Sequence, residues 1–481
     1  MEKINRRQIE KLMRDSNVFC ILPFKHTLLQ PRGTATICCM SPDPIPTNDN
    51  FIRWDKIDEQ REYKGDGSDV LVSKDGEAIV IDATEILEHL ADGWEEIDFE
   101  KVMQEAIRWE EVDFEKKIWQ GDTYQRIRKN MLTGKKSYEC RNCYKVEDSG
   151  SESYRNGQNK FELKHPEINN INIKSGNDFE QPVDWDIRLS RLCNLMCRMC
   201  NRNESSQIAK EADSNPDILL DYKSRATTFN YGEKDATYIL KTLPNMKRLK
   251  ILGGEPTLDP QVQLILDEAI KIGKTDLRLD ITSNLTNVTD KWLESLGRFK
   301  EVQLQFSIDG VGKTNEYIRW PSKWIQIEEN IEKYLTFKGE TNTNWYLSFH
   351  QTVSIYNIFD FWKVHEWIES LRTKDKYNRI ENLPEVSWHT YLVHYPTELD
   401  PSNVLQGNQK KEILEKFKAY RPNIKDTSGF TGVQSIVTLL EDTTEAKEIK
   451  SCKYRTEVID KIRNVNIKDY IPAVATVLNS G

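Results

Sequence analysis

The sequence predicts an α/β fold in which parallel strands and helices alternate around an open barrel. Beginning near residue 180, segments of alternating apolar and polar residues are separated by helical stretches, which is the order that produces a parallel sheet. Parallel strands covered on both faces read as continuous apolar runs, but here one face of each strand is polar. We therefore expect that face to line a wet or ligand-filled lumen. The predicted strands are residues 184–190, 248–252, 277–283, 302–309, 345–353 and 386–393.

The polar face of these strands carries side chains that could contact a ligand. His350 and His389 are candidates for substrate contact or acid–base work, and the alternative for each is a hydrogen-bonded structural histidine. An antiparallel sheet with one solvated face would give the same alternation, although the intervening helices favour parallel strands. One of these helices, 261–272, begins with Asp259 as N-cap and Pro260 at its first position. The polar positions are Arg188, Gln303, Gln305, Ser307, Ser348, His350, His389 and Tyr391.

Three regions follow one another along the chain. Residues 1–160 predict an irregular module with an acidic insertion at 60–118, residues 180–395 the barrel, and residues 396–481 a helical C-terminal cap. Within the insertion, Met103, Ile107, Phe114 and Ile118 are spaced for one helical face, which predicts a surface helix there. A further helix is expected near 124–132, ending at Gly134.

Bulk composition limits the classes of function. The chain has 481 residues, of which 30% are charged, and its formal net charge is −9. This modest negative charge argues against a general nucleic-acid binder held by phosphate contacts. No apolar run is long enough to span a bilayer, and the first residues lack an apolar core for export. We therefore expect a cytoplasmic protein without a membrane partner.

Nine cysteines are clustered rather than scattered along this sequence. Cys193, Cys197 and Cys200 form a CxxxCxxC loop directly after the first barrel strand, where active sites lie in such folds. Three thiolates can hold three irons of a four-iron cluster and leave the fourth iron open to a ligand. From the residues alone, a buried helical face and a zinc site stay open as alternatives.

A second motif, Gly253-Gly254-Glu255-Pro256, ends the second predicted strand. Glycine lets the backbone approach a ligand closely, although this tetrapeptide alone is also an ordinary turn. Its place one strand after the cysteine loop makes the functional interpretation the stronger one.

Together, CxxxCxxC after the first strand and GGEP after the second resemble the radical S-adenosylmethionine (SAM) superfamily over residues 183–395. The resemblance implies a TIM-like partial (β/α)6 barrel and a 4Fe–4S cluster, held by the three cysteines, whose open iron chelates SAM. The residue before the last cysteine is usually aromatic in that superfamily, and here it is Met199, which is apolar enough to shield a cluster. The residues that the resemblance assigns to SAM contacts are Gly253, Gly254, Glu255, Ser283, Asn284, Ser307 and Arg319.

The remaining cysteines leave room for one further cluster. Residues 19–39 and 118–155 resemble the beginning and end of a SPASM or twitch auxiliary module, placed here before the barrel instead of after it. The arrangement is similar to uncharacterised twitch-type proteins of tailed-phage genomes. A four-cysteine zinc site is the alternative for this group. Cys452 is expected to be structural, with a radical relay or a spare ligand as the alternatives. The expected ligands are Cys20, one of Cys38 and Cys39, Cys140 and Cys143.

The sequence thus predicts an enzyme that cleaves SAM to a 5′-deoxyadenosyl radical, which abstracts hydrogen from a substrate C–H bond. The resemblance implies a peptide or protein substrate that is oxidised or cross-linked, with a small molecule also possible. It also implies an external one-electron donor such as a flavodoxin or ferredoxin. Two rivals stay open: radical SAM modification of a nucleotide or sugar, and a zinc-binding interaction protein.

Overall fold

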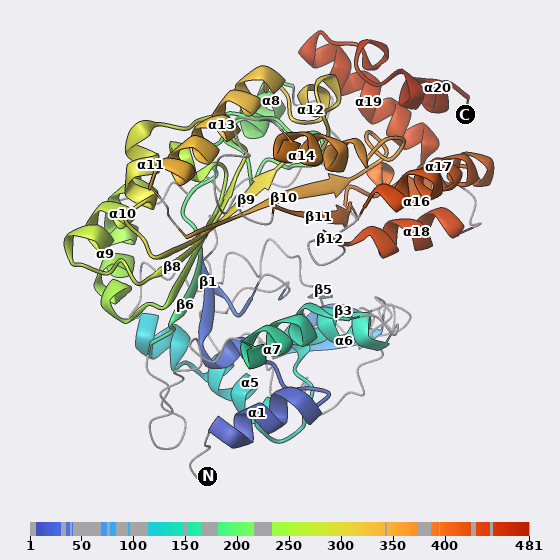
Figure 1. Cartoon of the computed structure of the whole chain (residues 1–481). Coiled ribbons are helices and arrows are strands. Elements are labelled where there is room, and N and C mark those ends of the chain that lie inside the picture. The colour runs from blue at the N-terminus through green and yellow to red at the C-terminus, as the bar shows by residue number, and fades with distance from the viewer. Residues whose placement is uncertain are drawn as a thin grey trace. The chain divides into compact units, whose positions relative to one another are not determined.

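A computed structural model of the chain describes residues 6–29, 35–38, 41, 69–74, 77–82, 95–96, 114–148, 152–164, 181–215, 233–341, 344–373, 386–393, 395–424, 430–442 and 446–480 (Figure 1). The chain divides into two compact units. The first comprises residues 1–189 and 228–250, and the second comprises residues 190–227 and 251–481. The C-terminal helices therefore belong to the same unit as the later strands, whereas the three-region division of the sequence stays a prediction.

The second unit contains a parallel sheet in the order β8-β9-β10-β11-β12. All four of its strand pairs are parallel, so the antiparallel alternative is wrong for this sheet. Along β9, half-buried and buried residues alternate, as the sequence pattern predicts. The strands are β8 (Arg278–Ser283), β9 (Glu301–Ser307), β10 (Trp345–Val353), β11 (Ser387–Leu392) and β12 (Phe430–Thr431).

Helices cover the apolar face of this sheet (Figure 1). Aromatic side chains of α13 and α14 pack on the strands: Tyr334 lies 5.0 Å from Phe306, and Trp367 lies 5.2 Å from Phe349, between ring centroids. As predicted, Asp259 caps α10 by accepting a hydrogen bond from the Gln261 amide, with Pro260 at the first helical position. The connecting helices are α8 (Ser206–Ser214), η7 (Pro256–Leu258), α10 (Pro260–Lys271), α11 (Asp290–Leu296), α12 (Lys313–Ile318), α13 (Trp324–Thr341) and α14 (Lys363–Thr373).

The C-terminal residues are mainly helical where the structure describes them. Here α19 ends at Arg463 and is followed by Asn464, which takes the left-handed conformation with φ 51°. The elements are η8 (Thr397–Leu399), α16 (Pro401–Val404), α17 (Gly407–Tyr420), η9 (Arg421–Asn423), α18 (Val433–Glu441), α19 (Ile449–Arg463), η10 (Ile467–Asp469) and α20 (Pro472–Ser480).

The first unit contains strands in the order β2-β1-β6-β7. Strand β1 pairs in parallel with β6, with His26 opposite Asp184, so the N-terminal module contributes a sheet strand that the sequence analysis missed. This segment has only four residues, His26-Thr27-Leu28-Leu29, which is too short for a period to distinguish a strand from a loop or a helical turn. The strands are β1 (His26–Leu29), β2 (Ala35–Thr36), β6 (Asp184–Arg188) and β7 (Arg248–Leu252).

The insertion at 60–118 contains strands that the sequence analysis missed. Its described part includes an antiparallel sheet of β3 (Asp69–Lys74), β4 (Glu77–Asp82) and β5 (Glu95–Glu96). Both longer strands are rich in Val, Ile and Leu and flank an Asp75-Gly76 pair, which is a strong short hairpin signal in a sequence. Met103 and Ile107 lie outside the described residues, and Ile118 is buried in a π-helix, η3 (Glu115–Trp119).

Helices complete the first unit. Phe114 is buried with its ring 5.3 Å from Trp185 and 5.3 Å from Tyr238. The predicted helix near 124–132 is α5, and Gly134 follows it with φ 77°. The helices are α1 (Arg6–Asp15), η1 (Leu22–Phe24), α5 (Asp122–Leu132), η4 (Tyr138–Cys140), α6 (Arg141–Asp148), α7 (Tyr154–Lys164), α9 (Glu233–Thr242) and η6 (Leu243–Asn245).

Across the described ranges of both units, no helix combines the length and apolarity needed to cross a membrane.

Candidate functional site

The cysteine loop, residues 191–205, is held by hydrogen bonds on two sides. Its backbone amides at Met196 and Arg198 donate to the carbonyls of Trp320 and Ile318, at 2.6 Å and 2.9 Å. The hydroxyl of Ser205 donates to the Leu195 carbonyl at 2.7 Å and caps α8. These bonds occupy backbone groups that an irregular loop would otherwise leave unpaired.

The three thiols of the loop lie close enough to influence one another. Burial raises the pKa of Cys197 to about 12, with Cys193 raising it further and Arg319 opposing the change. Burial also raises the pKa of Cys200, and Cys197 adds to this effect. The pKa of Cys193 is also raised, chiefly by burial. The loop therefore brings three protonated thiols together, and a metal must displace their protons in order to bind.

The glycine motif is bound directly to the cysteine loop. The Gly254 amide donates to the Ser190 carbonyl at 3.1 Å, and the Glu255 amide donates to the Leu192 carbonyl at 2.7 Å. A Cβ atom at Gly254 would lie 2.2 Å from the Leu192 carbonyl oxygen, which no real side chain can do. Gly253 has φ 132°, a backbone conformation that favours glycine. Both glycines are therefore required for the two motifs to meet.

Glu255 organises the end of β8. Its buried carboxylate accepts hydrogen bonds from the Ser283 hydroxyl at 2.9 Å and from the Asn284 amide at 2.6 Å. Thr257 adds its own amide and hydroxyl at 3.2 Å and 2.8 Å. Burial raises the pKa of Glu255 in spite of these bonds. Three of the predicted SAM contacts therefore form one hydrogen-bonded cluster.

Two residues that the sequence analysis missed link this cluster to the thiols. The Asn284 side-chain amide lies 3.8 Å from the Cys193 sulfur and donates to Asn194 Oδ1 at 3.1 Å. Thr286 exchanges hydrogen bonds with both Asn194 and Asn284, at 2.8 Å and 2.6 Å. Asn194 lies inside the CxxxCxxC loop. A polar residue between two predicted ligands was the feature of the sequence that could have identified it.

Arg319 and Ser307 lie near the carboxyl end of β9. Arg319 Nε forms an ion pair with Asp309 Oδ2 at 2.7 Å, and Asp309 Oδ1 accepts a hydrogen bond from the Thr352 amide at 2.8 Å. Burial lowers the pKa of Arg319, but Asp309 and then Cys197 outweigh it, so the pKa lies above its ordinary value. Ser307 pairs across the sheet with His350.

A hydrogen-bonded chain crosses the polar face beside Ser307. The Ser348 hydroxyl donates to the Leu304 carbonyl at 3.3 Å and lies 3.0 Å from His350 Nε2. The Tyr391 hydroxyl lies 3.3 Å from His350 Nδ1, and the rings of His350 and His389 are 4.9 Å apart. Burial lowers the pKa of His389, which favours its neutral form. This face therefore presents paired imidazoles and a half-exposed phenol.

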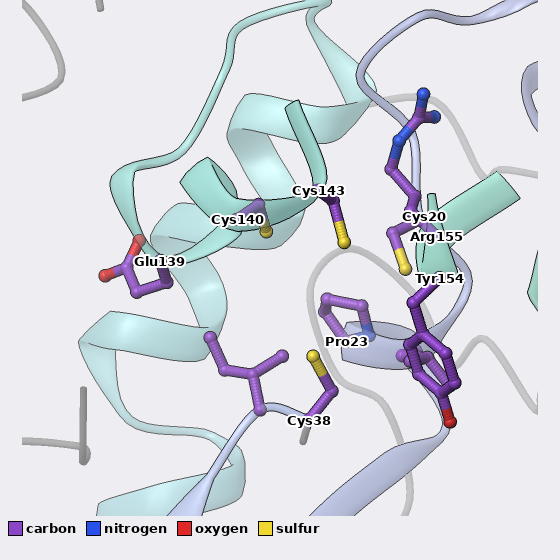
Figure 2. Close-up of a pocket in the computed structure, with 10 residues that line it drawn as sticks. Cys20, Pro23, Cys38, Glu139, Cys140, Cys143, Tyr154 and Arg155 are labelled. Carbon is purple, nitrogen blue, oxygen red and sulfur yellow. The ribbon is translucent and has the colours of Figure 1, made fainter. Parts of the chain in front are cut away.

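The second cysteine group lines a cavity in the first unit. Figure 2 shows the sulfur atoms of Cys20, Cys38, Cys140 and Cys143 directed toward one space. Burial raises the pKa of Cys20 to about 12 and that of Cys140 well above its usual value, and Cys20 and Cys38 raise the latter further. The structure thus brings four of the five predicted residues together, whereas Cys39 lies outside the described residues.

Residues of α7 fix the segment that carries Cys20. Asn159 accepts from the Ile21 amide at 3.0 Å and donates to the Phe19 carbonyl at 2.8 Å. Arg155 donates to the same Phe19 carbonyl at 2.7 Å and to Glu147 at 2.9 Å. Asn159 was missed by the sequence analysis, because an asparagine in a polar helix gives no signal of a distant partner.

Thiols are the donors that iron–sulfur clusters use, and a cluster distributes them over several irons. The donor chemistry of both cysteine groups therefore fits such a cluster. Within the described ranges, no group of three or more His, Cys, Asp or Glu side chains is arranged to hold a single metal ion.

Comparison with known families identifies the class of the central domain. Residues 187–361 match the model of the radical SAM superfamily, so the resemblance in the cysteine and glycine motifs is confirmed and this part of the chain is a radical SAM domain. Membership of that superfamily implies a 4Fe–4S cluster and SAM.

Among individual proteins, the sporulation killing factor maturation protein SkfB of Bacillus subtilis (strain 168) is 24% identical over 149 residues. The match spans 31% of this chain and about a third, 32%, of SkfB. Among solved structures, Streptococcus suis SuiB bound to the precursor peptide SuiA has a TM-score of 0.32 and 15% identity, over 81% of this chain and 78% of SuiB. Native anSMEcpe with bound AdoMet has a TM-score of 0.31 and 11% identity, over 48% of this chain and 58% of that one. Structural likeness at these scores carries no argument about activity.

Proposed function

We propose that the chain is a radical SAM enzyme that oxidises or cross-links a peptide or protein, using one cluster at the cysteine loop and one auxiliary cluster. The observation that carries this proposal is the junction of the two motifs, where Gly254 passes against the Leu192 carbonyl and Asn284, held by Glu255, reaches Cys193. The junction brings the thiols of the loop close to backbone and amide groups, which supports a site where an iron chelates SAM.

Cys193, Cys197 and Cys200 would hold the 4Fe–4S cluster. When bound, the reduced cluster supplies one electron that splits SAM into methionine and a 5′-deoxyadenosyl radical, which takes a hydrogen atom from a substrate C–H bond. Arg319, close to Cys197 and neutralised by Asp309, is suited to receive the SAM carboxylate.

The chain's other residues position the cofactor. Both oxygens of the Glu255 carboxylate already accept hydrogen bonds, so we assign Glu255 to holding Ser283 and Asn284 in place. Contact with the methionine amine then falls to the backbone carbonyls of Gly253 and Gly254. Ser307 and the side chains of 283–284 are polar groups at strand ends, as ribose binding requires.

Cys20, Cys38, Cys140 and Cys143 would hold the auxiliary cluster, because they direct four thiols into one cavity. Such a cluster would take up the electron that the substrate loses after hydrogen abstraction. The proton lost with it needs an acceptor, and the His389 imidazole, whose pKa is lowered by burial, is suited to that task beside His350. An external one-electron donor such as a flavodoxin or ferredoxin would reduce the SAM cluster.

The peptide substrate is supported by the relative SkfB, whose name describes maturation of a killing factor. We place the reaction in the cytoplasm, where thiols stay reduced.

The first test is anaerobic purification with measurement of iron, sulfide and zinc, followed by addition of dithionite and SAM. We expect a coloured protein with two clusters per chain that forms 5′-deoxyadenosine. A colourless protein with zinc and no iron or sulfide would overturn the proposal.

The substrate class needs a separate measurement. Deuterated peptides encoded by neighbouring genes would be compared with deuterated nucleosides and sugars, and the deuterium content of 5′-deoxyadenosine measured by mass spectrometry. Transfer from a peptide is expected, and transfer only from a nucleoside or sugar would replace this substrate with the rival class.

A further inference from the structure

Arg198 is an unexpected residue in the cysteine loop, because it places a full positive charge between two predicted cluster ligands. Its side chain is only 1% exposed, and its guanidinium lies 3.6 Å from the centre of the Tyr317 ring. Its Nε donates to the Tyr317 carbonyl at 3.0 Å, and its Nη2 meets Asp460 Oδ1 at 2.5 Å. The charge of the loop is therefore neutralised by a residue of α19, more than 250 positions later in the chain.

Asp460 serves as an anchor for several segments. Its Oδ1 also accepts a hydrogen bond from the Tyr317 hydroxyl at 2.7 Å, and its Oδ2 accepts one from the Ile467 amide at 2.7 Å. Tyr317 thus contacts both members of the charge pair. This network fixes the carboxylate in place against the Arg198 guanidinium.

A second buried charge pair joins α19 to the helix that follows the cysteine loop. Arg463 donates from Nε and Nη2 to the two carboxylate oxygens of Glu211 in α8, both at 2.8 Å. Cys200 packs against Ile208 and Ala212 of the same helix, so this charge pair lies on a helix that contacts the cysteine loop. Within the described residues, Nη1 of Arg463 and Nη1 of Arg198 are buried without a hydrogen-bond acceptor.

Stability alone does not account for these pairs. Burying an ion pair costs desolvation energy that its attraction barely recovers, and apolar residues of equal volume are often as stable. Charge close to a cluster acts differently on its two redox states, because reduction adds negative charge to the site. A neighbouring cation favours the reduced state, and an anion favours the oxidised one.

We propose that α19 belongs to the cluster site, and that its pairs Arg198–Asp460 and Arg463–Glu211 hold the cysteine loop and set the reduction potential of its cluster. This inference rests on the proposed function, because it requires a cluster at Cys193, Cys197 and Cys200. In it, Asp460 and Glu211 are positioning residues. Each carboxylate keeps a guanidinium from shifting the potential upward.

The test measures the midpoint potential of the SAM cluster by redox titration with electron paramagnetic resonance, in the full-length holoprotein. Asp460→Asn keeps the shape of the side chain but leaves Arg198 charged, because arginine is not deprotonated in proteins. We expect its potential to rise. The double variant R198M/D460N removes the unneutralised cation, so its potential should not rise above that of the wild type.

Glu211→Gln provides a second test of the midpoint potential if Asp460→Asn fails to retain its cluster. It leaves Arg463 unneutralised near Cys197 and should also raise the potential. The matched control is Asp267→Asn, which breaks an exposed ion pair with Lys291 and should leave the potential unchanged.

The outcomes separate this inference from the proposed function. A wild-type protein without iron would overturn both. A wild type with two clusters, combined with charge variants whose potentials stay constant or fall, would overturn the role of α19 and leave the proposed function standing. Loosening of the loop alone would lower iron retention in the single and double variants alike, without the upward shift confined to the single ones.

Discussion

The two cysteine groups bring their thiols together in different ways. The loop group lies within eight consecutive residues, Cys193 to Cys200, and depends on the rest of its unit to hold that loop. The cavity group is drawn from separate segments, with Cys20 before η1, Cys38 after β2, Cys140 at the end of η4 and Cys143 in α6. A local motif fixes which residues are ligands, whereas a dispersed set depends on tertiary structure to bring its members together.

Their electrostatic surroundings differ as well. Near the loop, Arg319 and Arg463 both lower the pKa of Cys197, against the larger effect of burial. Around the cavity, burial is again the largest effect on Cys20, but Arg155 is balanced by Glu147. The loop therefore has two guanidinium groups beside it, and each is paired with a carboxylate, Asp309 or Glu211. Beside the cavity, Arg155 is paired with Glu147 in the same way, and the enclosure suits a cluster closed by four thiols.

Cys197→Ala gives the largest expected effect. Because the loop has only three thiols, we expect the loss of one cluster's iron and of all 5′-deoxyadenosine formation. Iron analysis and chromatography of the SAM reaction measure these losses.

Cys452→Ala is the matched control, since Cys452 is a buried thiol of α19 outside both groups. It should retain both clusters and full SAM cleavage. Equal loss in the two variants would contradict the division of roles.

Cys143→Ala separates the two groups. We expect one cluster to be lost from the first unit, while dithionite and SAM still yield 5′-deoxyadenosine. Product formation should fall below detection, because the substrate electron then lacks its acceptor. Loss of SAM cleavage in this variant would show that the two groups do not act separately.

The sequence could predict the loop group and the parallel strands because both depend on local patterns. CxxxCxxC and GGEP are contiguous, and strands such as β9 show period-two alternation over their whole length. The pairing of β1 with β6 and the contact of Asn159 with the Cys20 segment depend on residues more than 130 positions apart. No local period encodes such contacts. The strands β3 and β4 are a different case, since the Asp75-Gly76 pair between them is a local hairpin signal that the sequence analysis did not use.

Gly254→Ala tests how the loop depends on its neighbour. The added Cβ would overlap the Leu192 carbonyl, so the backbone must shift at a cost of about 1–3 kcal/mol, typical of overpacking. We expect lower denaturation midpoints and weaker iron retention at the loop, with the cavity cluster unaffected.

Gly157→Ala is the control, because it lies in α7 with nothing within 4 Å of the added atom. Alanine there should stabilise the helix by about 0.5–1 kcal/mol. Equal destabilisation by both substitutions would contradict the special role of Gly254.

The smallest expected effect is the pH dependence of the unfolding free energy of the metal-free chain. Burial raises the pKa of Cys20 from 9.0 in the unfolded chain to about 12 in the folded one, so the folded state binds more protons between these values. Stability then falls as pH rises from 9 toward 12, and the contribution is complete below pH 9. Cys20→Ala removes this titration, so its unfolding free energy, measured with denaturant at pH 8 and pH 10, should decline less than that of the wild type. An equal decline would mean that the Cys20 thiol is not enclosed, and the description of the second cysteine group as a closed cavity would lose its basis.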